Sequence, residues 1–123
     1  MLKARDLVKL VESKEDPKYT VFYFNSYGAN EALTRALFDD GGESNIPVSL
    51  SDYIELTEVR AADKEHVFYL MQGETWSPMG EARECIRSVG LKHTSMMMGD
   101  LVRDPDGQYW VCAMMGFKKV NVQ

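Results

Sequence analysis

A short polar segment, His93-Thr94-Ser95 followed by Asp100, holds the side chains of this chain that are best suited to chemistry. A histidine beside a hydroxyl residue can activate a serine nucleophile. Glu74 could join His93 or Asp100 in a small acid–base site. One hypothesis is therefore a small-ligand or nucleotide-binding protein, or a hydrolase, that uses the loop from His93 to Asp100.

The sequence around this segment favours a structural role for it. Ser95 lacks the Gly-x-Ser-x-Gly turn that presents the nucleophilic serine of many hydrolases. A two-histidine phosphoesterase needs a hydroxyl residue two positions after each histidine, and His66 is followed by Phe68 at that position. Thr94 and Ser95 are typical of residues that hydrogen-bond to the backbone in a loop, and His93 would orient that loop. We therefore assign no catalytic residue and favour a protein that is not an enzyme.

Metal and cofactor motifs are the next candidates. The chain has 2 cysteines and 2 histidines, but Cys85 and Cys112 lack the Cys-x-x-Cys spacing of a structural zinc site. Both cysteines fall on the apolar faces of predicted elements, which indicates buried thiols. The glycines match no phosphate loop, dinucleotide fingerprint or calcium loop. We expect neither a metal nor a cofactor.

Length and charge limit the class of protein. A chain of 123 residues with 45% hydrophobic residues is the size of one domain, so we assign residues 1–123 to a single domain. The net charge is −5 and the basic residues are scattered, which disfavours nucleic-acid binding. No apolar run approaches the roughly 18–20 residues of a membrane-spanning helix. The charged N-terminus is unlike a signal peptide, so we expect a cytoplasmic protein without a membrane contact.

The first half of the chain predicts a helix and a central strand. Residues 2–14 place apolar side chains at helical spacing, and Pro17 ends this pattern. Residues 19–24 are aromatic or β-branched, with apolar side chains on both faces, which predicts a central strand. Asn30 can cap a short helix that continues to residue 38, and a loop follows over residues 39–45.

The middle of the chain predicts a second strand and one ambiguous segment. Residues 53–60 alternate imperfectly and read as a strand. Residues 63–71 contain a continuous apolar run that suits a buried strand. Asp63 is also a good helix N-cap, and Val67 and Leu70 stand at helical spacing. Periodicity does not decide between the two.

The second half predicts a helix and a hairpin. Ser77-Pro78 is a helix start, and Gly90 is a helix end in the left-handed conformation. Residues 100–103 and 108–115 read as two strands, joined by a type I turn at residues 104–107. We predict an α+β fold with an antiparallel sheet of about four strands, three to four helices and a C-terminal β-hairpin.

A second set of residues could contact a partner. Five of the 8 methionines stand at residues 96–98 and 114–115, where they could fill the core or form an adaptable protein-binding surface. Trp76 could pack between two helices or anchor a partner. The candidate partner-binding residues are Trp76, Met97, Met115 and Phe117.

The C-terminal half carries a resemblance in the order of its motifs. They are Ser95-x-x-x-Gly99-Asp100-Leu101-Val102, Tyr109-x-Val111 and Gly116-Phe117-Lys118-Lys119-Val120. This order resembles the ending of a diffuse group of small phage- and plasmid-borne proteins, in which a Ser-Val-Gly-Asp-Val stretch, Tyr-x-Val and Gly-Phe follow one another. The chain departs from the group at residues 96–98, and its predicted helix at residues 77–90 is an addition. The resemblance implies a mobile-element origin and a helix at residues 63–71, and it implies no activity.

These observations favour a phage or mobile-element accessory protein that binds a host or viral protein during takeover or counter-defence. A homodimer is compatible with them. The ligand-binding or hydrolytic reading of the loop from His93 to Asp100 is the alternative.

Overall fold

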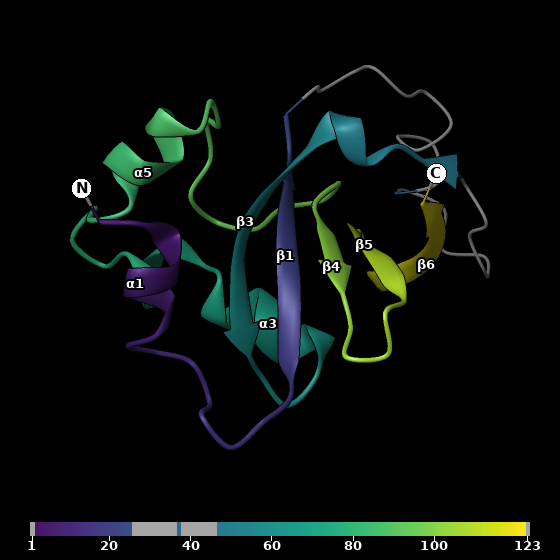
Figure 1. Ribbon diagram of the computed structural model, residues 1–123, viewed down its shortest axis with the longest axis horizontal. Helices are drawn as coiled ribbons and strands as arrows, with labels where there is room; N and C mark the ends of the chain where they lie inside the picture. The colour runs from purple at the N-terminus through teal and green to yellow at the C-terminus, as the bar shows by residue number, and fades with distance from the viewer. Residues whose placement is uncertain (1, 26–36, 38–46, 123) are drawn as a thin grey trace.

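The computed structural model describes residues 2–25, 37 and 47–122, and these form one mixed sheet with helices packed on it (Figure 1). The 6-stranded sheet has the order β2-β6-β5-β4-β1-β3. β2 pairs with β6 in parallel, and every other pair of neighbours is antiparallel. The strands are β1 Lys18–Phe24, β2 Pro47–Val48, β3 Tyr53–Arg60, β4 Leu101–Arg103, β5 Tyr109–Ala113 and β6 Gly116–Val122.

The helices in the described part of the chain are short. They are α1 Ala4–Val8, α3 Lys64–Leu70, α4 Gly73–Trp76 and α5 Arg83–Ser88, with a 3-10 turn, η1, at Leu50–Asp52. The α+β prediction is confirmed. The predicted sheet of about four antiparallel strands was too small and missed the parallel pair. The added strands are β6, in which only Val120 is buried, and β2, which is too short to show a pattern.

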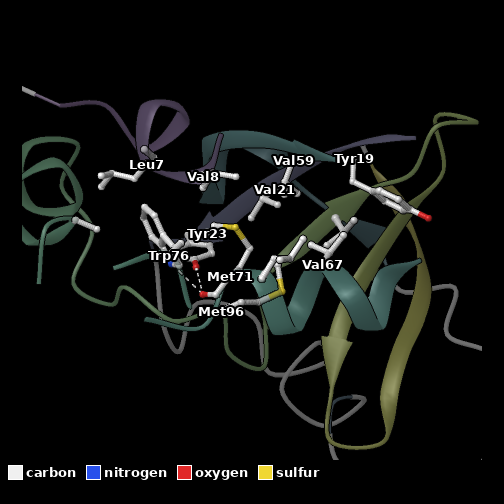
Figure 2. Packing of buried hydrophobic residues seen from close by; sticks show 14 of the residues in the cluster. Leu7, Val8, Tyr19, Val21, Tyr23, Val59, Val67, Met71, Trp76 and Met96 are labelled. Atoms are coloured by element: carbon white, nitrogen blue, oxygen red, sulfur yellow. Dashed lines mark hydrogen bonds between the residues drawn. The ribbon is translucent and has the colours of Figure 1, made fainter. Parts of the chain in front are cut away.

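β1 separates two buried cores, as its two apolar faces predicted. Tyr19, Val21 and Tyr23 pack into the core on the helix side of the sheet. Phe22 and Phe24 pack into the core on the opposite side. The helix-side core gathers residues from α1, α3, α4 and α5 around this strand, and Figure 2 shows its centre. Because β1 is hydrogen-bonded between β3 and β4, it is interior to the sheet.

The N-terminal helix is shorter than predicted, because the chain after Val8 docks on β3. Glu12 accepts a hydrogen bond from the backbone N–H of Arg60 at 3.0 Å. Ser13 donates its own N–H to the carbonyl of Arg60 at 2.9 Å. These contacts turn residues 9–13 along the sheet edge and end the regular helix at Val8.

The ambiguous segment is a helix, as the resemblance implied. Asp63 caps α3 by accepting the backbone N–H of His66 at 2.8 Å. Val67 and Leu70 are buried, which matches their helical spacing. The predicted helix from Asn30 to residue 38 and the loop at residues 39–45 lie outside the described residues, except for the buried Leu37.

The helix predicted from Ser77 starts later, at Arg83. Ser77 instead ends α4, and its hydroxyl accepts the N–H of Ala82 at 2.8 Å, so it stabilises the turn before α5. The predicted end is confirmed. Gly90 has φ +84°, its N–H bonds to the carbonyl of Arg87, and the N–H of Leu91 bonds to that of Ile86. This is the paired hydrogen-bond pattern of a glycine-terminated helix.

The C-terminal hairpin of β4 and β5 is also confirmed. Gly107 has φ +87° and donates its N–H to the carbonyl of Asp104 at 3.0 Å. The carboxylate of Asp104 accepts the backbone N–H groups of Asp106 and Gln108 and the indole N–H of Trp110, each at 2.9 Å. One side chain therefore holds both the turn and the first residues of β5.

Candidate functional site

The structure brings His93 and Asp100, two candidate residues of the same loop, into contact. His93 Nε2 lies 2.9 Å from Asp100 Oδ2. The imidazole stacks on the ring of Tyr23, with centroids 4.5 Å apart and 13° between the planes. The stacking places the histidine against β1, a contact that no spacing in the sequence reveals.

Asp100 is a buried junction between three segments. Its Oδ1 accepts the backbone N–H of Phe24 at 2.9 Å, and its Oδ2 accepts that of Met97 at 2.9 Å. Burial raises the pKa of Asp100, and the hydrogen bonds from His93, Phe24 and Met97 offset only part of this rise. The carboxyl group thus ties the end of β1 to the loop that precedes β4.

The neighbouring hydroxyl residues also hold this loop in place. The carbonyl of Thr94 accepts the phenol O–H of Tyr23 at 2.7 Å and the indole N–H of Trp76 at 3.2 Å. The hydroxyl of Ser95 accepts the backbone N–H of Gly73 at 2.7 Å, which ties the loop to the start of α4. The Ser95 hydroxyl therefore makes the predicted kind of contact with the backbone, whereas Thr94 holds the loop through its carbonyl.

The contacts above form one cluster around His93, Thr94, Ser95 and Asp100. The other predicted site residues near it in the sequence are Glu74 and Trp76. Glu74 is exposed on α4 and makes none of the contacts that hold the cluster. Trp76 is only 1% exposed, and its indole also donates to the carbonyl of Met71 at 3.0 Å (Figure 2). The ring of Trp76 fills the helix-side core, as the packing interpretation expects, so it is not exposed to a partner in this structure.

The polar side chains of the cluster are hydrogen-bonded to one another or to the backbone. Within residues 2–25, 37 and 47–122, no buried side-chain nitrogen or oxygen lacks a hydrogen-bond partner. No group of three or more histidine, cysteine, aspartate or glutamate side chains in the same residues could hold a metal ion. The hydrogen bonds of Asp100, Ser95 and the Thr94 carbonyl position the loop, and a separate candidate for contact with a partner lies at the β5–β6 turn.

That candidate is an apolar groove between α3 and the turn that joins β5 to β6. Its volume is about 210 Å³. Met114 and Met115 on the turn are 62% and 71% exposed. The described residues that line the groove are Glu65, Phe68, Cys112, Ala113, Met114, Gly116 and Phe117.

Only some of the predicted partner-binding residues lie at this groove. Phe117 lines it, and Met115 stands in the chain between two of its lining residues. Met97 is exposed but belongs to the loop before β4, outside this lining. Sequence reasoning missed Glu65 and Phe68, because their place beside the groove depends on how α3 crosses the sheet.

The groove and the buried cluster are joined through the backbone. The N–H of Cys112 donates to the carbonyl of Asp100 at 2.8 Å, and the N–H of Gly99 donates to the carbonyl of Cys112 at 2.9 Å. Burial, and then the charge of Asp100, raise the pKa of the Cys112 thiol to about 12. The groove therefore contains a protonated, unreactive thiol on a strand that the Asp100 loop holds in place.

Comparison with protein-family models, curated proteins and solved structures finds no match to this chain. Among the described residues, no helix is long and apolar enough to cross a membrane.

Proposed function

We propose that this protein acts by binding another protein, whose apolar side chain enters the groove between α3 and the β5–β6 turn. The observation that carries this proposal is the exposure of Met114 and Met115 beside an apolar groove. Exposed apolar surface next to a cavity is typical of a protein-binding site. Methionine suits such a site, because its flexible thioether adapts to the partner's shape.

The size and charge of the groove indicate which partner side chains fit it. A cavity of about 150 Å³ lined by aliphatic side chains holds benzene. The volume of about 210 Å³ therefore accommodates one aromatic or large aliphatic side chain. Glu65 is the charged residue of the described lining, so a lysine or arginine close to the anchor would complement it.

The biological role that fits this binding is that of a phage or mobile-element accessory protein. The partner would be a host or viral protein, met in the host cytoplasm during takeover or counter-defence. The resemblance of the C-terminal half to small phage- and plasmid-borne proteins supports this role, and the groove supports the binding.

The test uses site-specific crosslinking in bacterial cells. A benzophenone amino acid replaces Met115 in one tagged variant and Met79 in the other, and both are crosslinked in the living cell. Met79 is 87% exposed, in the turn before α5, so it is a matched methionine away from the groove. We expect one defined partner at position 115 and not at position 79. The same products at both positions, or none at 115, would overturn the proposal.

A further inference from the structure

We propose that the free part of the β3 edge receives an extended segment of a partner protein as an added strand. This surface is separate from the groove beside α3. β3 ends the sheet on the side where α1 and α5 lie (Figure 1). Adding a strand to such an edge is a common mode of peptide recognition, in which backbone hydrogen bonds supply affinity and neighbouring pockets supply specificity.

The second half of this edge is closed by the N-terminal segment. The carbonyl of Glu58 accepts a hydrogen bond from Arg5 Nη1 at 2.7 Å. The N–H of Arg60 donates to Glu12, and its carbonyl accepts the N–H of Ser13. Proteins commonly cover sheet edges in this way to prevent unwanted pairing.

The first half of the edge is open at Glu55. The N–H of Asn25 donates to the carbonyl of Asp52, which fixes the alternation of hydrogen bonds at the start of β3. Counting from there, Ile54 points its backbone groups toward β1 and Glu55 points its own outward. A bulge at Leu56 then restores the alternation that Glu58 and Arg60 follow. Within the part of the chain that the structure describes, no hydrogen bond is made to the outward-facing backbone N–H and carbonyl of Glu55.

A cavity lies directly beside this open edge. Its volume is about 340 Å³, which is larger than the groove beside α3. Leu2 and Val89 border it with exposed apolar side chains. The described residues that line it are Leu2, Lys3, Ala4, Glu55, Leu56, Cys85, Ser88 and Val89.

The register defines the added segment. Glu55 pairs with Phe22, whose side chain lies in the core on the side opposite α1, α3, α4 and α5. The partner residue opposite Glu55 therefore points to that same face, and its two neighbours point toward the helix side, where Ile54 and Leu56 pack. We infer a lysine or arginine opposite Glu55, flanked by apolar residues of which one enters the cavity.

Charge argues against a second copy of this chain as the occupant. The open edge is so short that a symmetric antiparallel pair would be centred on Glu55 and would place this residue opposite itself. Like charges directly opposite each other destabilise a strand pair. The net charge of −5 adds to the repulsion between two copies.

The experiment selects peptides from a random twelve-residue library, displayed on their messenger RNA, against the folded protein. We expect enriched peptides with a basic residue between two apolar residues, and NMR shifts at the amide of Glu55 on binding. Methylation of the peptide nitrogens that face β3 should weaken binding about tenfold or more, the loss of at least one backbone hydrogen bond. Enriched peptides that shift only other amides, or that tolerate methylation, would overturn the proposal.

A charge reversal provides the control. Selection against Glu55→Lys should enrich an acidic residue at the central position, whereas Glu74→Lys, also exposed, should keep the basic preference. The substitution Met115→Asp should leave binding of the selected peptides unchanged, so the failure of this edge and of the groove beside α3 can be told apart. An unchanged preference in Glu55→Lys would contradict the inferred register.

Discussion

The phenol of Tyr23 stacks on the imidazole of His93 while its hydroxyl donates to the carbonyl of Thr94, one residue further along. One side chain of the central strand thereby holds two consecutive residues of the loop before β4. Asp100 completes the arrangement from the other end of that loop through its contact with His93. Because the backbone N–H of Cys112 donates to the carbonyl of Asp100, the same loop supports β5, the strand that lines the groove.

Replacing Asp100 with asparagine should destabilise the fold. The carboxylate accepts two backbone N–H groups and contacts His93, and the amide of asparagine would turn a donor toward at least one of them. We expect a loss of about 1.5–3 kcal/mol of unfolding free energy, the range for hydrogen bonds to a charged group. Urea denaturation measures it, with Asp106→Asn in the exposed turn as the control. Equal stability of the two variants would show that Asp100 is not a junction.

The titration of Asp100 gives a prediction with a definite sign. Burial raises its pKa in the folded state above the ordinary value of 3.8. The folded protein then binds this proton more tightly than the unfolded chain, so the group favours folding most below pH 3.8 and progressively less as pH rises through the raised pKa. Carbon-detected NMR of the carboxyl group should give a midpoint above 3.8, and a midpoint below it would contradict the assignment.

Glu12 should show the opposite sign. Burial alone would raise its pKa, but the hydrogen bonds and charges of Arg5 and Arg60 outweigh burial and lower the pKa from 4.5. Its contribution to stability is therefore complete above pH 4.5 and lost as pH falls through the lowered value. Glu12→Gln should cost stability at pH 7 and much less at pH 2, as measured by urea denaturation. A cost that is independent of pH would contradict the ion pair with Arg5.

The two thiols should be inert in the folded protein. Cys85 and Cys112 are both buried, and burial raises the pKa of each. Because the thiolate is the reactive form, Ellman's reagent at pH 8 should modify neither residue in the native state and both in guanidinium chloride. Rapid release of one equivalent from the native protein would show that a cysteine is accessible.

Local patterns in the sequence were sufficient for several elements. The apolar run of β1, the span of β3, the turn at Gly107 and the helix end at Gly90 each depend on neighbouring residues alone. These features could therefore be predicted without tertiary information.

Other features depend on contacts between distant segments. The early end of α1 comes from the docking of Glu12 and Ser13 on Arg60. β2 joins the sheet through two residues that pair in parallel with the end of β6. The stacking of Tyr23 on His93 and the place of Phe68 beside the groove likewise follow from packing that spacing does not encode.

The most direct test of partner binding at the groove is the affinity of Met115→Asp for the partner that crosslinks at position 115. A buried charge at a binding hot spot costs more than about 2 kcal/mol, or about thirtyfold in affinity. We expect that loss for Met115→Asp and an unchanged affinity for the matched control Met79→Asp. Equal affinities for the two variants would show that the partner does not use the groove.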